Sequence, residues 1–518
     1  MMKKLLSYLT VIMGISLLNS TTAAQQAVFN KVYYNPEEGF YLLGSDRCAD
    51  NGYILAGIKQ NNSGHLIKTD SSANPEWARQ INVAEFNFEI RDVICNPDST
   101  IVSAGIVDAS SDLLNIIKWD KGGDTLWSKN IEGLSYIEEL RINRSYSGGY
   151  LITASNIAFK LHDDGELEWS KRYLSDDHLI YLSSIAELPG NNLIMCGYRL
   201  NKTTNVRNLI VIQTDENGNV VWAESLSESG AYTYSEAEDI AVTQDGIVLY
   251  SKYSGNYLYN GGLIKLEFDG YPVWAKNYAL YVYQTWKNTR KNFTLTHDGG
   301  FAIVSSFGNE GQLMKTDQSG TPQWVQSIFM EAVNVVASND HGYMVLGNGP
   351  VVGLKKVPDN IPQIGVYKTD SLGNGGDCIY PLIIQEEEFT TLFENFTVLA
   401  SDFGNLAKIT LSINDFQFLT EDTCVAYTGS IKDYQTMKET LKISPNPAST
   451  VISVESGLSL NPGSTLEIIS ASGSLIRKIL YTNNPFPVSL TELPNGIYLL
   501  RLINNQQYLT GKLVVDHK

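Results

Sequence analysis

The stretch TDENGNVVWAES, residues 214–225, joins a turn-forming run to an apolar pair and a tryptophan. A tight hairpin turn needs positive φ at one or two residues, and glycine accepts such values without steric cost. The runs LIVIQT before the turn and VVWAES after it have the length and composition of short strands. We therefore predict an antiparallel hairpin here.

The same hairpin recurs along most of the chain. Counted from the residue two before Asp215, a tryptophan follows nine positions later in six copies, at spacings of 50, 42, 53, 52 and 50 residues. Glycine stands five positions after this origin in every copy except the first, which has Ala73. A second hairpin signal, such as DNGYILAG or DGGFAIVSS, precedes each copy. Each repeat therefore holds four short strands, and no helical periodicity competes with this interpretation.

Four antiparallel strands repeated every 42 to 53 residues are typical of a β-propeller. A seventh copy begins at Lys368 and lacks the tryptophan, while VFNKVYY near the N-terminus places Phe29 in the corresponding position. We predict an all-β fold, with a seven-bladed β-propeller over residues 25–380 closed by the N-terminal strand in the last blade. Aromatic rings at the repeated position are expected to pack neighbouring blades together. These rings are Phe29, Trp77, Trp127, Trp169, Trp222, Trp274 and Trp324.

The first 24 residues have the features of a signal peptide. Lys3 and Lys4 precede an apolar run, and Thr22-Ala23-Ala24 offers small residues for cleavage. No later segment approaches the roughly 20 apolar residues of a transmembrane helix, so we expect none. The net charge of −18 argues against nucleic acid and anionic membranes as partners, because both require clustered lysine and arginine.

The TDxxGxxxW hairpin resembles the repeat of quinoprotein-type (PQQ-like) propellers, and more closely that of exported surface-protein propellers. The resemblance covers residues 27–380. Quinoprotein dehydrogenases are usually eight-bladed, with adjacent paired cysteines and a calcium site beside the cofactor. This chain has no adjacent cysteines and its repeat count fits seven. These departures from the quinoprotein pattern weaken an enzymatic interpretation, and no cofactor is expected.

The periodicity stops after residue 380. We expect a short β connector over residues 381–437, and a separate module over residues 438–518. The module resembles the C-terminal sorting domain (type A) of the type IX secretion system, a small β-sandwich. The resemblance implies that the secretion machinery is a partner and that the protein passes through the periplasm and the outer membrane, to be secreted or held at the outer cell surface. An accessory adhesion domain of similar fold is the alternative. The matching motif residues are Pro445, Asn446, Pro447, Gly473, Pro494, Gly496, Tyr498 and Lys512.

The five cysteines form neither a metal-type CxxC pair nor a dense disulfide framework. A bridge between Cys378 and Cys424 is one interpretation, and five small buried hydrophobic side chains are the other. Five repeats place aspartate two positions after the origin, and we expect these residues to cap their own turns instead of binding calcium. They are Asp70, Asp120, Asp215, Asp317 and Asp370.

One set of side chains could converge in the centre of a propeller. The motifs IRDVI, IEELRI and AEDIAV place Asp92, Glu139 and Asp239 on strands expected to line the channel at similar heights. Three such carboxylates could hold a cation or, suitably paired, cleave a glycosidic bond. Hydrated charges at the channel rim are the simpler interpretation. The sequence therefore favours a non-enzymatic propeller that binds a protein or glycan. A polysaccharide-active or quinoprotein-like enzyme is the alternative.

Overall fold

The computed structural model describes residues 28–517, with gaps of which the longest are 281–290, 350–362, 423–440 and 457–463. The remaining gaps span one to five residues each. The expected signal peptide lies outside the described residues. The chain divides into two compact units, Met1–Ala426 and Tyr427–Lys518, which are described separately below.

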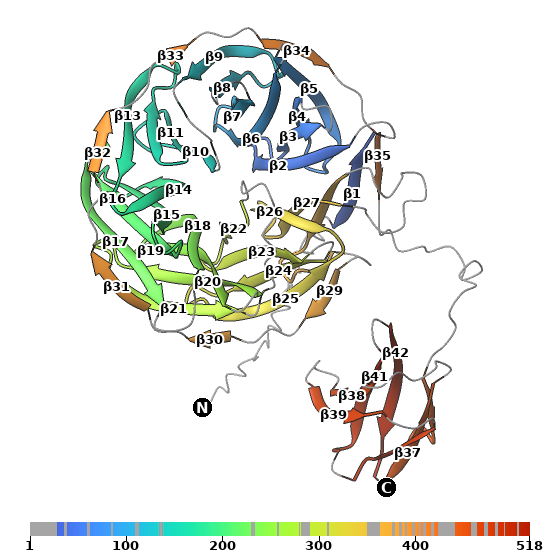
Figure 1. Ribbon diagram of the computed structural model, residues 1–518. Coiled ribbons are helices and arrows are strands. Elements are labelled where there is room, and N and C mark those ends of the chain that lie inside the picture. Colours follow the sequence, from blue (N-terminus) through green and yellow to red (C-terminus); the bar gives the residue numbers. More distant parts are fainter. Residues whose placement is uncertain are drawn as a thin grey trace, which may run out of the picture. The chain divides into compact units, whose positions relative to one another are not determined.

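The first unit is a propeller-like ring of antiparallel sheets (Figure 1). Five sheets have five strands each, and a sixth has ten. The ten-stranded sheet consists of two halves that meet at one parallel bridge, Arg207 with Tyr234. Each sheet or half-sheet is named here by its first strand, which lies nearest the centre of the ring.

The strands of the first four groups are as follows. The β2 sheet contains β2 (Phe40–Arg47), β3 (Tyr53–Lys59), β4 (Gly64–Thr69), β5 (Pro75–Val83) and β34 (Leu411–Asp415). The β6 sheet contains β6 (Asn87–Cys95), β7 (Ile101–Asp108), β8 (Leu113–Trp119), β9 (Thr125–Ile131) and β33 (Leu406–Ala407). The β10 sheet contains β10 (Leu140–Arg144), β11 (Tyr150–Ala154), β12 (Ile157–Leu161), β13 (Leu167–Leu174) and β32 (Leu399–Asp402). The β14 half-sheet contains β14 (His178–Glu187), β15 (Leu193–Asn201), β16 (Arg207–Thr214), β17 (Val220–Glu228) and β31 (Thr391–Asn395).

Three further groups follow. The β18 half-sheet contains β18 (Tyr234–Thr243), β19 (Gly246–Gly255), β20 (Leu258–Leu266), β21 (Pro272–Tyr278) and β30 (Glu386–Glu388). The β22 sheet contains β22 (Phe293–Leu295), β23 (Phe301–Phe307), β24 (Glu310–Thr316), β25 (Pro322–Ile328) and β29 (Ile379–Leu382). The β26 sheet contains β26 (Glu331–Ala337), β27 (Tyr343–Asn348), β28 (Ile364–Thr369), β1 (Phe29–Tyr34) and β35 (Leu419–Asp422).

The N-terminal strand completes the β26 sheet. β1 pairs with β28, and Phe29 stands opposite Lys368. The same register joins Lys68 to Trp77 and Lys315 to Trp324 in other sheets. Phe29 therefore occupies the position that tryptophan occupies elsewhere, as its sequence motif predicts.

The segment that follows the repeats runs back around the outside of the ring. Strands β29 to β35, residues 379–422, pair in turn with the β22, β18, β14, β10, β6, β2 and β26 groups (Figure 1). We name these seven strands the outer belt. The expected β connector thus supplies the outermost strand of every sheet, and the first compact unit extends to Ala426.

Hydrophobic clusters lie between each pair of neighbouring sheets. The cluster between the β26 and β2 sheets contains Tyr33 and Val366 on one side and Phe40 and Leu42 on the other. Packing between the first and last sheets therefore has the same character as packing elsewhere in the ring.

Each repeated glycine adopts the backbone conformation of its turn and leaves space for the aromatic side chain of the preceding sheet. Gly218 has φ of 78°, and a Cβ atom added there would lie 2.9 Å from Cζ3 of Trp169. The Trp169 indole remains half-exposed, and its Nε1 donates to the Glu216 carbonyl at 2.9 Å. The exception, Ala73, belongs to the cluster against which the smaller Phe29 ring packs. The packing of Trp169 between sheets thus combines partial burial of the indole with a hydrogen bond from its Nε1.

The repeated aspartates cap their own turns, as predicted. Asp215 Oδ1 accepts from the N–H groups of Asn217 and Asn219, at 2.9 and 2.8 Å. Asp70 makes the same two bonds, at 2.9 and 2.7 Å, with Ser72 and Asn74. These carboxylates replace backbone partners in the turn.

Cys48 and Cys95 form a disulfide that joins the β2 and β6 sheets, with Cα atoms 5.0 Å apart. For these two cysteines, the expectation of unbonded hydrophobic side chains was wrong. Their separation of 47 residues is close to one repeat, so the ends of the inner strands of two neighbouring sheets are joined. The considered pair, Cys378 and Cys424, lies outside the described residues.

The second unit contains two sheets around one core. The first has the order β36 (Lys442–Ser444), β37 (Val451–Glu455), β40 (Phe486–Ser489). The second has the order β39 (Leu475–Leu480), β38 (Thr465–Ser470), β41 (Gly496–Asn504), β42 (Gln507–Val515). Ile452, Leu466, Leu500 and Leu513 are among the buried core residues.

Several of the motif residues in this unit have defined structural roles. The Asn446 side chain donates to the Lys512 carbonyl at 2.6 Å and accepts from the Val514 N–H at 2.8 Å. Tyr498 donates its hydroxyl hydrogen to the Pro494 carbonyl at 2.8 Å. Both prolines flanking Asn446 follow cis peptide bonds. Gly496 begins β41, and Gly473 lies outside the described residues.

Within the described part of the chain, no helix has the length and hydropathy needed to cross a bilayer.

Candidate functional site

One residue from each sheet occupies an equivalent position on its inner strand or directly before it. Backbone pairing of each inner strand with its neighbour defines this set, which we name the channel ring. Its members are Gly44, Asp92, Arg141, Ser184, Asp239, Asn292 and Asn334. Two of the three predicted carboxylates, Asp92 and Asp239, belong to it. Glu139 lies two residues earlier, immediately before β10, and Arg141 takes its place.

Asp92 links three sheets. Its side chain is fully buried, and its Oδ1 and Oδ2 accept from the N–H groups of Val93 and Ile142 at 2.8 and 3.0 Å. Lys291 Nζ lies 3.2 Å from Oδ1 and donates to the Val93 carbonyl at 2.9 Å. A buried carboxylate satisfied in this way acts as a structural cross-link. The hydrated-rim interpretation is therefore wrong for Asp92.

Asp239 is also held by its neighbours but is only half-buried. Its Oδ1 accepts from the Ser184 hydroxyl and from the Ile240 N–H, both at 2.9 Å. Burial raises the pKa of the Asp239 carboxyl, and the nearby Arg141 guanidinium only partly opposes this. The carboxyl is thus easier to protonate than an ordinary aspartate.

Arg141 lies among the channel acids and is 4% exposed. Burial would lower the pKa of its guanidinium, but the charges of Asp239, Asp92 and Glu139 raise it overall. The sequence contains this arginine in the same motif as Glu139, IEELRI. Only alignment of the inner strands shows that Arg141, and not Glu139, matches Asp92 and Asp239.

Two further acidic residues, Glu238 and Glu139, lie close to the channel ring in the sequence. Lys252 forms an ion pair with Glu238, and the Asn292 side chain donates to Glu238 Oε2 at 2.6 Å. Glu139 is 7% exposed, and its main-chain carbonyl accepts from the Ser155 N–H at 3.0 Å. Among the residues described, no group of three or more His, Cys, Asp or Glu side chains is arranged to hold a metal ion. Arginine and lysine side chains thus provide positive charge where the sequence suggested a cation.

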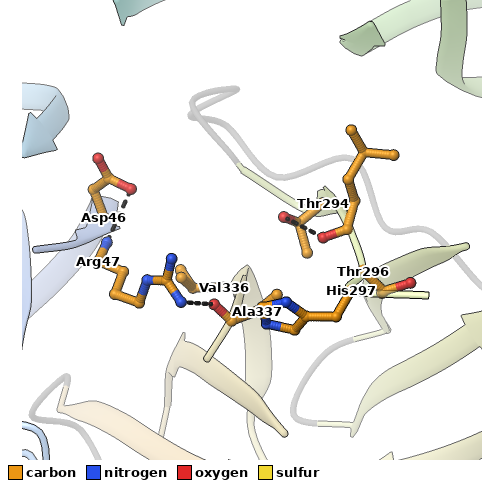
Figure 2. A pocket seen from close by; sticks show the side chains of 8 residues that line it. Asp46, Arg47, Thr294, Thr296, His297, Val336 and Ala337 are labelled. Atoms are coloured by element: carbon orange, nitrogen blue, oxygen red, sulfur yellow. Dashed lines mark hydrogen bonds between the residues drawn. The ribbon is translucent and has the colours of Figure 1, made fainter. Parts of the chain in front are cut away.

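A pocket of about 300 Å³ lies where the inner strands β2, β22 and β26 end (Figure 2). Asp46 and Arg47 come from β2, and Val336 and Ala337 come from β26. The remaining lining residues belong to β22 and to the turn after it. They are Thr294, Leu295, Thr296 and His297. Sequence analysis did not identify this pocket.

Two side chains in the pocket are anchored on consecutive main-chain carbonyls. Arg47 Nη1 donates to the Ala337 carbonyl at 3.1 Å and to Asn339 Oδ1 at 2.5 Å. The His297 Nε2 atom lies 2.8 Å from the Ser338 carbonyl oxygen, so Nε2 carries the hydrogen. Figure 2 shows both side chains reaching toward the end of β26 from opposite sides. The polar groups of the pocket are therefore held in place without a ligand.

Asp46 supplies a carboxylate beside these donors. Its Oδ1 accepts from the Arg47 N–H at 2.9 Å, and its Oδ2 accepts from the Cys95 N–H at 2.8 Å. Burial raises the pKa of Asp46, and Lys291 only partly offsets the effect. The second bond connects the pocket to the residue that forms the disulfide with Cys48.

No curated protein matches this chain. Among solved structures, a streptogramin B lyase is 14% identical, with a TM-score of 0.42 over 65% of this chain and 97% of that chain. The PQQ-bound aldose sugar dehydrogenase of Streptomyces coelicolor is 8% identical, with a TM-score of 0.31 over 65% of this chain and 100% of that one. A protein of unknown function from Bacteroides caccae is 14% identical, with a TM-score of 0.30 over 48% and 94% of the two chains. With TM-scores this low, none of these likenesses carries an argument about this chain.

The second unit gives a specific match. Residues 442–516 match the family described as the secretion system C-terminal sorting domain. This range contains all the motif residues that the sequence resemblance identified. The C-terminal module is therefore a sorting domain of the type IX secretion system, which exports the protein to the cell surface or into the medium.

Proposed function

We propose that the protein is a non-enzymatic, seven-bladed β-propeller that binds a protein or a glycan through one face of its ring. In this proposal residues 25–380 form the four inner strands of each blade, residues 381–437 form the connector that contributes most of the outer belt, and residues 438–518 form the sorting domain. The type IX secretion machinery is the export partner, residues 1–24 are a signal peptide, and no resident cofactor is assigned.

The strand pairing supports seven blades. Counting the two halves of the ten-stranded sheet separately gives seven groups that share one internal order, from an inner first strand to a strand of the outer belt. A hydrophobic cluster lies at each of the seven junctions between successive groups. The single bridge between Arg207 and Tyr234 is a small connection beside the ladders within each half.

The main support for a binding role is that the channel carboxylate Asp92 is fully engaged in hydrogen bonds and an ion pair within the fold. Both oxygens of Asp92 accept main-chain N–H groups, and Lys291 neutralises the carboxylate. A carboxylate that holds three sheets together is poorly suited to exchanging protons with a substrate, because its charge stabilises the fold. The pocket between β2, β22 and β26 instead offers anchored polar groups near one end of the inner strands.

A specific observation favours the enzymatic alternative, a polysaccharide-active or quinoprotein-like propeller. Burial raises the pKa of Asp239, and a raised carboxyl pKa is what a general acid needs at neutral pH. This alternative predicts turnover that disappears in Asp239→Asn.

The test uses the full exported chain on a glycan array and in a pull-down from native culture, followed by analysis of bound glycans for cleavage. Specific binding with unchanged ligand supports the proposal. Cleavage by the wild type that is lost in Asp239→Asn establishes the enzyme instead. Deletion of residues 438–518 should retain the protein in the periplasm, and surface display of the truncated chain would contradict the export route.

A further inference from the structure

We propose that the pocket between β2, β22 and β26 binds a single neutral sugar ring through its hydroxyl groups. This inference rests on the proposed binding function and identifies its ligand class and site.

The size of the pocket limits the ligand. A volume of about 300 Å³ lies at the lower end of the range for small-molecule sites, roughly 300–1,000 Å³. One sugar ring suits this volume, whereas several rings in a row do not. Leu295 and His297 are exposed at the pocket edge, so the rest of a glycan could continue outward.

The lining offers the groups that a sugar needs. Both hydrogens on Arg47 Nη1 are used by Ala337 and Asn339, which leaves the Nε and Nη2 hydrogens without partners among the described residues. The Asp46 oxygens each accept one main-chain N–H and retain further lone pairs. A hydroxyl group can donate to Asp46 while accepting from Arg47. Leu295 and Val336 provide apolar surface for the C–H face of a ring.

The donors are also held before a ligand arrives. The anchoring of Arg47 and His297 on the Ala337 and Ser338 carbonyls removes much of the side-chain entropy that binding would otherwise cost. Fixed polar groups of this kind select by geometry, which favours a rigid ring over a flexible ligand.

The charge around the pocket favours a neutral ligand. Asp46 and Arg47 line the pocket with opposite charges, and the nearby Asp298 and Asp340 form ion pairs with Lys315 and Lys368, each at 2.9 Å. The chain as a whole carries a net charge of −18. The lining therefore offers no net positive charge to a carboxylate-bearing sugar, and Asp46 repels such a carboxylate, since like charges at a binding site are costly.

The repeat provides a matched control. Arg144, three residues after its channel-ring residue as Arg47 is, donates from Nη1 to Asn96 Oδ1 at 3.1 Å. This bond joins the β10 and β6 sheets, as the Arg47 bond to Asn339 joins the β2 and β26 sheets. Arg144 does not line the pocket, so Arg144→Gln removes a comparable bridge elsewhere.

The experiment measures binding of glucose, galactose, mannose, N-acetylglucosamine and glucuronic acid to the full chain by saturation-transfer NMR and calorimetry. At least one neutral sugar should bind more tightly than glucuronic acid. Arg47→Gln should weaken that binding about tenfold or more, while Arg144→Gln should change it less than twofold. Thermal unfolding of each variant identifies any loss of folded protein.

The outcomes separate this inference from the proposed function. Preference for glucuronic acid, no monosaccharide binding by the wild type, or equal weakening by Arg47→Gln and Arg144→Gln overturns the sugar pocket. If the wild type and Arg47→Gln bind the same ligand on the array or in the pull-down equally well, the propeller is still a binding protein and the pocket assignment fails. Absence of any ligand in either assay removes both.

Discussion

Replacing Gly218 by alanine tests the packing of one sheet against the next. Gly218 lies in the turn between β16 and β17, with φ of 78°. An added Cβ would lie 2.9 Å from both Trp169 Cζ3 and Lys171 Cγ, which belong to the preceding sheet. The substitution therefore introduces backbone strain and a steric clash at the same point.

The expected cost follows from these two effects. Placing a non-glycine residue in the left-handed region costs about 1–2 kcal/mol, and overpacking adds about 1–3 kcal/mol. Gly218→Ala should therefore lower the free energy of unfolding of the ring by about 2–5 kcal/mol. Gly190 is the control in the same half-sheet, because its φ is 93° and no atom lies within 4 Å of an added Cβ. Gly190→Ala should cost only the backbone strain, about 1–2 kcal/mol.

Urea unfolding followed by tryptophan fluorescence measures this difference. All eight tryptophans lie between residues 77 and 324, so the signal reports the ring and not the sorting domain. Equal destabilisation by Gly218→Ala and Gly190→Ala would refute the packing argument, since it would leave turn strain as the sole effect. The double variant Trp169→Ala/Gly218→Ala should recover part of the cost, because truncating the indole removes the clash.

Three further predictions concern other parts of the molecule. Reduction of the Cys48–Cys95 bridge, or the variant Cys48→Ser/Cys95→Ser, should lower the free energy of unfolding of the ring by about 4 kcal/mol. This value follows from the loop-closure entropy of a crosslink that spans 47 residues, and the same urea titration measures it. Asn446→Ala should lower the stability of the sorting domain by about 1–3 kcal/mol, because two hydrogen bonds to the last strand are lost; hydrogen exchange at β42 checks this, and unchanged protection would contradict it. Burial raises the pKa of Glu467, but hydrogen bonds from Arg501 and Lys478 outweigh it and the net pKa is lowered. The stability that Glu467 contributes is therefore complete above the ordinary glutamate pKa and lost as pH falls through the lowered value, so Glu467→Gln should flatten the acid limb of sorting-domain stability, followed by circular dichroism.

The repeated features of the ring could be predicted because their causes are local. A turn glycine, a capping aspartate and a ring nine positions after the origin each appear within about one hairpin, so the sequence displays them as a period. The position of Phe29 was predicted for the same reason, since its motif matches the other copies. Its pairing with Lys368 follows from that match.

The channel could be predicted only in part. Asp92 and Asp239 were identified as inner-strand residues, and the structure places them at equivalent positions. The motif IEELRI predicts a carboxylate here through Glu139, but Arg141 holds the equivalent position and supplies the opposite charge. The inner strands β2, β6, β14, β18 and β26 each contain a bulge just before the channel-ring residue, whereas β10 pairs with β11 without one. The offset between the sequence motif and the equivalent position therefore differs from sheet to sheet.

The pocket and the outer belt arise from contacts between distant segments. The pocket combines residues near positions 46, 296 and 336, and no local motif connects them. The outer belt consists of strands of two to five residues, too short for alternation to identify them, and their partners lie up to 391 residues away in the pairing of Lys31 with Asp422.

The outer belt changes the physical account of how the ring remains closed. A propeller of four-stranded sheets would expose one unpaired strand edge per sheet, and such edges invite association with other chains. In this ring the belt occupies the outer edge of β1 and of the fourth strand in every other group. The β26 sheet holds β28, β1 and β35, so the end of the repeats, the N-terminal strand and the end of the belt meet there. Removing β1 from the β26 sheet would break two strand ladders, one with β28 and one with β35. Removing β1 and β35 together would break the ladder with β28 and also disrupt the hydrophobic cluster that contains Tyr33. Closure therefore depends on the hydrophobic cluster between the β26 and β2 sheets, on the ladder between β1 and β28, and on the second ladder that β35 of the outer belt adds to β1.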